Sequence, residues 1–167
     1  MKTIRLLQYM VMVATVAAVG TLPTMATSEF GFDINVVLSK KAAARLSHDK
    51  ETISTIVSFS GEPKSSAKKR VNEIGLISVS PQNQWIEVSG RGGAIHVSGD
   101  NIALKTLQLV EGEISVNVNV VSGRKTNSEN VLSCDFIDGK LSVVKKKSPV
   151  SLHCALIEEN KETVVLP

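Results

Sequence analysis

Alternating hydrophobic and polar positions recur along most of the chain after residue 30. The clearest run is Ile114–Val121, in which β-branched residues alternate with serine and asparagine. A period of two puts the apolar side chains on one face of a strand, which is typical of a half-buried antiparallel strand. Shorter runs of the same kind predict eight further strands, at residues 34–38, 53–59, 74–79, 85–88, 94–98, 131–136, 141–144 and 150–157.

Turn-forming residues separate these runs. Asp138-Gly139 lies between the predicted strands 131–136 and 141–144, and it predicts a hairpin there. Val-Ser-Gly closes three other runs, and we interpret each copy as the turn that ends a strand. Two polar segments are predicted to be surface loops, namely residues 123–130 and 145–149.

Two short helices are predicted between the strands. Ser39 is placed to cap a helix over residues 40–46, which are good helix formers, and residues 65–72 predict a second helix. Many short strands with regular turns predict an all-β fold. We expect an antiparallel immunoglobulin-like or transthyretin-like sandwich with one or two short helices.

The first 26 residues follow a different pattern. Lys2 and Arg5 precede an apolar run over residues 6–20, and small residues stand at Thr24 and Ala26. This order is typical of a cleavable secretory signal, and the run is shorter than the ~18–20 apolar residues that span a bilayer. We therefore predict a signal peptide over residues 1–26. The remaining chain, residues 27–167, is predicted to be a single periplasmic or secreted domain without stable membrane insertion.

The chain contains two cysteines, Cys134 and Cys154. An even pair in an exported chain predicts one disulfide bond. Cys134 alternates with Leu132 and Phe136, so its sulfur is expected to face the core. Cys154 follows the same pattern in its own run, so we expect the disulfide to join two strands.

Charge argues against a nucleic-acid partner. Cleavage after Ala26 removes Lys2 and Arg5 but none of the 16 acidic residues, so the net charge falls from +3 to about +1. A nearly neutral domain has no field that attracts a phosphate backbone. We interpret the basic runs 68–70 and 145–147 as solvated loop charges, the second at a strand edge.

No catalytic residue, metal or cofactor is predicted. The three histidines, His48, His96 and His153, are not spaced as metal ligands on one element. The serines lie outside any G-x-S-x-G pattern. Two carboxylate pairs, Glu111 with Glu113 and Asp135 with Asp138, are interpreted as solvated strand edges and turns.

One glycine-rich segment is a candidate binding loop. It consists of Ser89, Gly90, Arg91, Gly92 and Gly93, and it is predicted to form the tip of a hairpin. Its backbone amides and Arg91 would be able to cradle an anion. The alternative interpretation is a hairpin loop in which glycine supplies positive φ angles.

Several short stretches of the chain resemble a group of small exported bacterial β-sandwich proteins that have no assigned function. These stretches are residues 38–44, 61–64, 73–75, 116–120 and 133–139. The resemblance implies export and a β fold, and it supplies no active site.

Three functional hypotheses follow from these patterns. The first is a non-enzymatic binding domain of the cell envelope or medium, whose partner is another envelope or extracellular protein. Its contacts are expected at the 89–93 loop and at an exposed edge strand. The second is a structural or assembly subunit of a surface structure. The third is a small periplasmic hydrolase or metal-dependent enzyme, which requires His96 or His153 beside a carboxylate and a serine.

Overall fold

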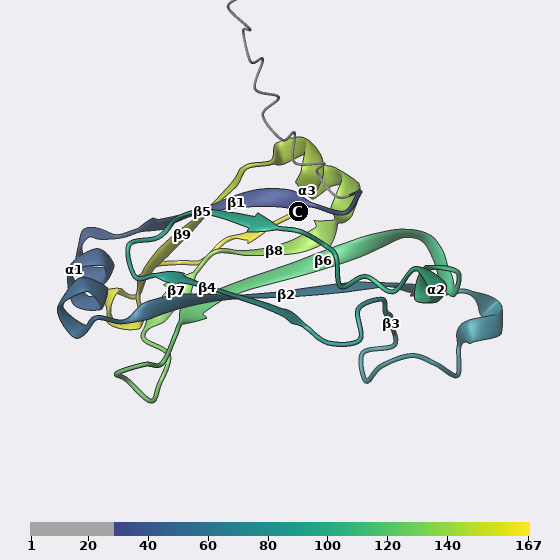
Figure 1. The fold of residues 1–167 in the computed structure, drawn as a ribbon, viewed down its shortest axis with the longest axis horizontal. Coiled ribbons are helices and arrows are strands. Elements are labelled where there is room, and N and C mark those ends of the chain that lie inside the picture. Colours follow the sequence, from purple (N-terminus) through teal and green to yellow (C-terminus); the bar gives the residue numbers. More distant parts are fainter. Residues whose placement is uncertain (1–28) are drawn as a thin grey trace, which may run out of the picture.

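Two β-sheets form the body of the molecule in the computed structural model, which describes residues 29–167 (Figure 1). The predicted signal peptide therefore lies outside the described residues. The first sheet has the order β5-β1-β9-β7 and contains β1 (Phe32–Leu38), β5 (Gly93–Val97), β7 (Leu132–Cys134) and β9 (Val150–Leu156). The second has the order β10-β8-β6-β2-β3 and contains β2 (Thr52–Pro63), β3 (Ile77–Ser78), β6 (Val110–Ser122), β8 (Phe136–Lys140) and β10 (Val165–Leu166). A further strand, β4 (Gln84–Ser89), also pairs with β2.

The helices are short and lie at the ends and upper rim of the sheets in the view of Figure 1. They are α1 (Lys40–Asp49), α2 (Leu104–Leu107) and α3 (Leu141–Lys147), with 3₁₀ turns at Ser65–Ala67 and Ile157–Glu159. Within residues 29–167, no helix is long and apolar enough to cross a membrane. The predicted all-β sandwich with short helices is confirmed.

Most strand pairings are antiparallel, as predicted. Among the described residues, six of the eight pairings are antiparallel, and the β1–β9 and β8–β10 pairings are parallel. In the β1–β9 ladder, Ile34 lies opposite Val150 and Leu38 lies opposite Cys154. The first sheet thus joins an early strand directly to a late one.

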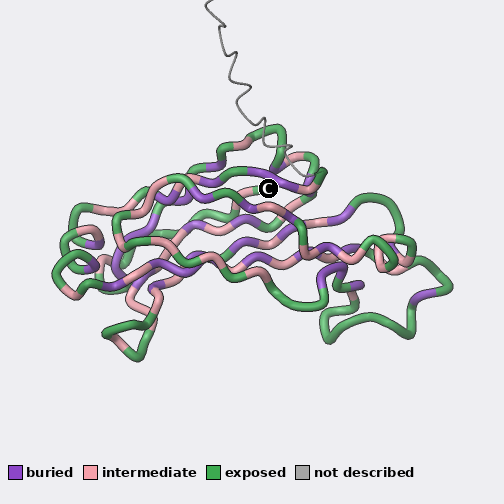
Figure 2. The backbone as a smooth tube through the Cα atoms, in the orientation of Figure 1, coloured by how far each residue is buried: buried purple, intermediate pink, exposed green. Residues whose placement is uncertain are grey.

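The hydrophobic core consists of the inward faces of both sheets, as the buried positions along the strands in Figure 2 indicate. In β6 the alternating residues Ile114, Val116, Val118 and Val120 are all buried, which confirms the clearest sequence pattern. Full burial of such a side chain contributes about 1.5–3 kcal/mol, so these four positions hold β6 strongly at the centre of the second sheet.

Helix α1 forms where it is predicted. The Ser39 hydroxyl accepts a hydrogen bond from the Ala42 amide at 3.0 Å, and Ala42 and Leu46 bury the inner face of the helix. Lys50 takes a left-handed conformation just after the helix, and its amide donates to the carbonyls of Leu46 and Ser47. The chain then turns directly into β2.

The predicted hairpin at Asp138-Gly139 is wrong. Both residues lie inside β8, opposite Asn117 and Val116 of β6. A side chain at position 139 would come within 2.6 Å of the Pro167 backbone, so glycine is needed there for close packing of the C-terminal segment.

The segment after β8 is a helix and not the predicted strand 141–144. Leu141 and Val144 are buried three positions apart, which is helical spacing. The predicted loop over 145–149 is shortened, because Lys145–Lys147 form the last turn of α3. There these cations lie at the negative end of the helix dipole instead of at a strand edge.

The second predicted helix, residues 65–72, is reduced to the 3₁₀ turn at its start. The Asn72 side chain explains why, since its Oδ1 accepts hydrogen bonds from the amides of Ile74 and Leu76. Such a local side-chain turn competes with a helix. The same turn also delays the predicted strand 74–79, of which only Ile77–Ser78 pair.

Candidate functional site

The two cysteines form the predicted disulfide. Cys134 in β7 and Cys154 in β9 are direct cross-strand partners, with their Cα atoms 4.0 Å apart. Cys154 is buried in the core, and Cys134 is partly buried against it. The bond therefore links β7, an edge strand of the first sheet, to its neighbour β9.

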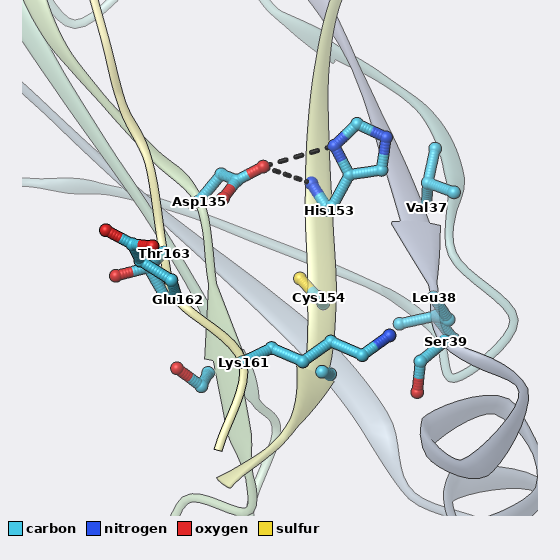
Figure 3. Close-up of a pocket in the computed structure, with 11 residues that line it drawn as sticks. Val37, Leu38, Ser39, Asp135, His153, Cys154, Lys161, Glu162 and Thr163 are labelled. Atoms are coloured by element: carbon cyan, nitrogen blue, oxygen red, sulfur yellow. Dashed lines mark hydrogen bonds and ion pairs between the residues drawn. The ribbon is translucent and has the colours of Figure 1, made fainter. Parts of the chain in front are cut away.

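A small pocket of about 150 Å³ lies beside the disulfide and contains a histidine–aspartate pair (Figure 3). The Asp135 Oδ2 atom accepts hydrogen bonds from the His153 amide at 3.0 Å and from its ring Nδ1 at 3.1 Å. The other oxygen, Oδ1, accepts from the Val164 amide at 2.9 Å. Asp135 thus connects β9 to the segment that precedes β10.

Asp135 is almost completely buried, so its interpretation as a solvated carboxylate is wrong. Burial raises the pKa of this carboxyl group, but hydrogen bonds from the Val164 and His153 amides outweigh that effect and hold the pKa below its usual range. Asp135 also marks the point at which the chain leaves the first sheet after β7 and enters the second at β8. These contacts give the carboxylate a structural role.

The hydrolase hypothesis requires a histidine beside both a carboxylate and a serine, and the pocket meets this condition only in part. Ser39 and Ser133 line it together with His153. The Ser39 hydroxyl is already engaged, because it donates to Glu159 at 2.5 Å and caps α1. Among the described residues the His153 ring hydrogen-bonds to neither serine. The geometry therefore orients an imidazole but aligns no nucleophile with it.

The other two histidines also face aspartates. His48 Nδ1 lies 2.8 Å from Asp49, and His96 Nδ1 lies 2.7 Å from Asp33. Both imidazoles are solvent-exposed, and exposed ion pairs contribute little to stability. Within residues 29–167, no group of three or more histidine, cysteine or acidic side chains is placed to hold a metal.

The candidate binding loop, residues 89–93, is a crossover between the two sheets and not the tip of a hairpin. It connects β4, which pairs with β2, to β5, which pairs with β1. Arg91 is exposed and lines a groove of about 250 Å³ beside Lys50 and Glu51. The sequence pattern is misleading because strand, short glycine loop and strand describe a crossover between packed sheets equally well.

Two of the loop glycines are explained by close backbone packing. A Cβ atom on Gly90 would lie 2.2 Å from the Glu51 carbonyl oxygen, and one on Gly92 would lie 2.5 Å from the Val36 carbonyl oxygen. Gly92 also has a φ of +71°. Anion binding by this loop remains a prediction.

We expect Gly90→Ala to lower the free energy of unfolding by about 1–3 kcal/mol, the usual cost of forcing extra atoms into a packed site. The clash is with backbone, which cannot rotate away. Urea denaturation of this variant and of Ser89→Ala, which adds no atom, provides the measurement. Equal unfolding midpoints for Gly90→Ala and the wild type would contradict the packing role.

Glu51 is the most strongly bound carboxylate near this loop. It is 3% exposed and accepts hydrogen bonds from four backbone amides, those of Thr52, Lys125, Thr126 and Asn127. Burial on its own would raise the pKa of this group. The hydrogen bonds from the four amides have the opposite and larger effect, and they lower the pKa to about 2. Glu51 thus anchors the polar loop 123–130 to the start of β2.

Trp85 opens a third candidate site, which sequence reasoning did not single out. It lies on β4, which among residues 29–167 pairs with β2 only and so forms an edge of the second sheet, and it is 65% exposed. A cleft of about 380 Å³ begins at this side chain. Its lining comes from the segment entering β4 and the segment leaving β5, and consists of Gln82, Asn83, Gln84, Trp85, Ser98, Asp100 and Asn101.

Hydrogen bonds orient two amide side chains in this Trp85 cleft. Gln84 Nε2 donates to the Ser98 hydroxyl at 3.4 Å, and Asn101 Nδ2 donates to the Gln82 carbonyl at 3.1 Å. The amide oxygens of Gln84 and Asn101 are buried and have no hydrogen-bond partner among the described residues. A sequence signal for the exposed tryptophan did exist, because Trp85 alternates in phase with the polar residues Glu87 and Ser89.

Comparison of the chain with protein-family models, with curated proteins and with solved structures gives no match.

Proposed function

We propose that this chain is an exported binding domain that acts outside the cytoplasm, and that it binds its target at the β4 edge around Trp85. The disulfide and the signal-like residues 1–26 support the part of the proposal that concerns export. The observation that carries the binding part is the exposure of the chain's single tryptophan.

A partner that covers the Trp85 side chain would gain binding free energy from it. A tryptophan buries 150–250 Å² on packing, which makes it one of the strongest contributors to a core or an interface. Trp85 instead faces solvent on an edge strand and adjoins a cleft with a polar lining. An exposed aromatic anchor beside such groups is typical of a binding site.

The catalytic alternatives have less support. Ser39 and Asp135 are already engaged in the hydrogen bonds that cap α1 and connect β9 to the C-terminal segment. His153 has no serine aligned with it among the described residues. Binding at Trp85, in contrast, requires no rearrangement of the fold.

We expect Trp85→Ala to weaken binding to the cell envelope at least about tenfold, since truncating an interface tryptophan usually costs more than about 1.4 kcal/mol. The measurement is cosedimentation of the purified, disulfide-closed protein with envelope fractions of its own host. Ile74→Ala is the matched control, because Ile74 is 77% exposed but lies outside the cleft. Equal sedimentation of all three proteins, or none at all, would refute the proposal.

A further inference from the structure

We infer that the loop between β2 and β3, residues 64–76, is a site of proteolytic modification, at which a trypsin-like serine protease hydrolyses the Arg70–Val71 peptide bond of the folded domain. The inference goes beyond the proposed function, because it concerns a different segment of the chain and does not depend on binding at Trp85. It is carried by a basic triplet that lies in the longest exposed run between residues 29 and 167.

The loop presents the side chains that such a protease recognises. Lys68, Lys69 and Arg70 follow one another, and all three are exposed. Among the described residues none of them forms an ion pair. Trypsin binds the side chain before the cleaved bond in a pocket that contains an aspartate. Arginine pairs with a carboxylate through two parallel hydrogen bonds, which favours cleavage after Arg70.

The backbone around this bond is accessible without unfolding of a sheet. Residues 68–75 are all exposed, and the loop projects from the end of β2 that lies away from α1 (Figures 1 and 2). The Arg70 amide donates to the Ala67 carbonyl, and the Asn72 amide donates to the Leu76 carbonyl, so these hydrogen bonds stay within the loop. Exposed loops of this kind are the preferred sites of proteolytic nicking.

Other basic segments are held more firmly by the fold. In the polar loop 123–130, which contains Arg124 and Lys125, the amides of residues 125–127 donate to the buried Glu51 carboxylate. Lys145–Lys147 form the last turn of α3. These segments must open before a protease can bind them in an extended form. We therefore expect the first cut at Arg70–Val71.

Cleavage at this bond leaves both new ends anchored. Ala67 before the bond and Ile77 after it are 1% and 2% exposed, so only a few residues on each side are freed. The N-terminal product keeps β1 and β2, which pair with β9 and β6 of the C-terminal product. The two chains should thus remain associated, although the disulfide does not join them.

The reaction is an ordinary hydrolysis that consumes one water molecule. The bond between the Arg70 carbonyl carbon and the Val71 nitrogen breaks. The hydroxyl group of the water is added to the carbonyl carbon, which becomes a carboxylate, and the nitrogen takes up the proton and becomes an amine. No oxidant, metal or further reactant is required.

The test uses trace amounts of trypsin on the exported, disulfide-closed protein, followed by mass spectrometry and nondenaturing size exclusion. We expect a first cut after Arg70 and two products that elute together at the position of the uncut protein. The triple variant Lys68→Gln/Lys69→Gln/Arg70→Gln should not be cut in this loop. The matched control Lys145→Gln/Lys146→Gln/Lys147→Gln removes the same charge elsewhere and should be cut like the wild type.

Destabilised variants distinguish cleavage of the folded domain from cleavage of the unfolded chain. If cleavage requires global unfolding, its rate increases with the unfolded population. Cys134→Ala/Cys154→Ala and Gly90→Ala should therefore be cut at Arg70–Val71 as fast as the wild type. Much faster cleavage of these variants, a first cut of the wild type outside the basic triplet, or separation of the two products on the column would each overturn the inference.

The two proposals of this article can fail separately. Cosedimentation with the envelope depends on Trp85, whereas the mass of the first products depends on residues 68–71. Loss of one result leaves the other standing.

Discussion

Replacing Glu51 by glutamine will lower the free energy of unfolding by about 3 kcal/mol at neutral pH, because hydrogen bonds to a charged group contribute about 1.5–3 kcal/mol and orphaned donors add to the loss. The Glu51 carboxylate is buried and its two oxygens accept from the Thr52, Lys125, Thr126 and Asn127 amides. A glutamine offers one oxygen, and its amide group would point N–H donors at backbone N–H donors.

The measurement is urea denaturation of the wild type, Glu51→Gln and Glu129→Gln at pH 7. Glu129 lies in the same polar loop but is exposed, so its substitution should leave the midpoint nearly unchanged. A midpoint for Glu51→Gln that matches the control would show that the carboxylate does not anchor the loop.

The low pKa of Glu51 also predicts that the free energy of unfolding decreases in acid. The folded pKa of about 2 is below the ordinary value of 4.5, so the stabilisation is fully present above pH 4.5 and is lost as the pH falls through 4.5 toward 2. The shift corresponds to roughly 3 kcal/mol over this range. We expect the stability difference between the wild type and Glu51→Gln to shrink between pH 5 and pH 2. A constant difference would contradict the assignment.

Removing the disulfide will also destabilise the domain by about 3 kcal/mol, the value that the chain-entropy model gives for a loop of this size. Cys134 and Cys154 are 20 residues apart, and the loop between them contains β8 and α3. We would measure guanidinium denaturation of the wild type with and without reductant, and of the variant with both cysteines changed to alanine.

Reductant should move the wild-type midpoint toward that of the double variant and leave the double variant unaffected. If the wild type unfolds at the same denaturant concentration in both conditions, the bond adds nothing to stability. The alanine at 154 also leaves a small cavity in the core, so the double variant is expected to be slightly less stable than the reduced wild type.

Local patterns predicted the parts of the fold that local physics determines. Alternation in Ile114–Val121 identified a central strand, and Ser39 identified a helix start, because strand period and helix capping depend on neighbouring residues only. The Asp138-Gly139 pattern predicts a hairpin wrongly. Its glycine is required instead because the Pro167 backbone packs closely against it, and no local pattern reveals that contact. The apolar run 141–144 fits both periods, and its burial in α3 decides between them.

The sites divide in the same way. The disulfide could be predicted because the chain has only two cysteines, in matching apolar runs. The Asp135–His153 pair could not, because it depends on the register of β7 against β9. Three of the four amides that Glu51 binds lie more than seventy positions away in the chain, so its anchoring role is visible only in the folded structure.

The parallel pairing of β1 with β9 determines when the first sheet can be completed. A chain that leaves the ribosome or a translocation channel from its N-terminus presents β1 long before residues 150–156 are available to pair with it. Until then β1 has only β5 as a neighbour, and the sheet lacks the strand that carries Cys154. Such distant contacts make folding slow, because a long loop must close before the contact forms. The first sheet can therefore be completed only after nearly the whole chain has emerged.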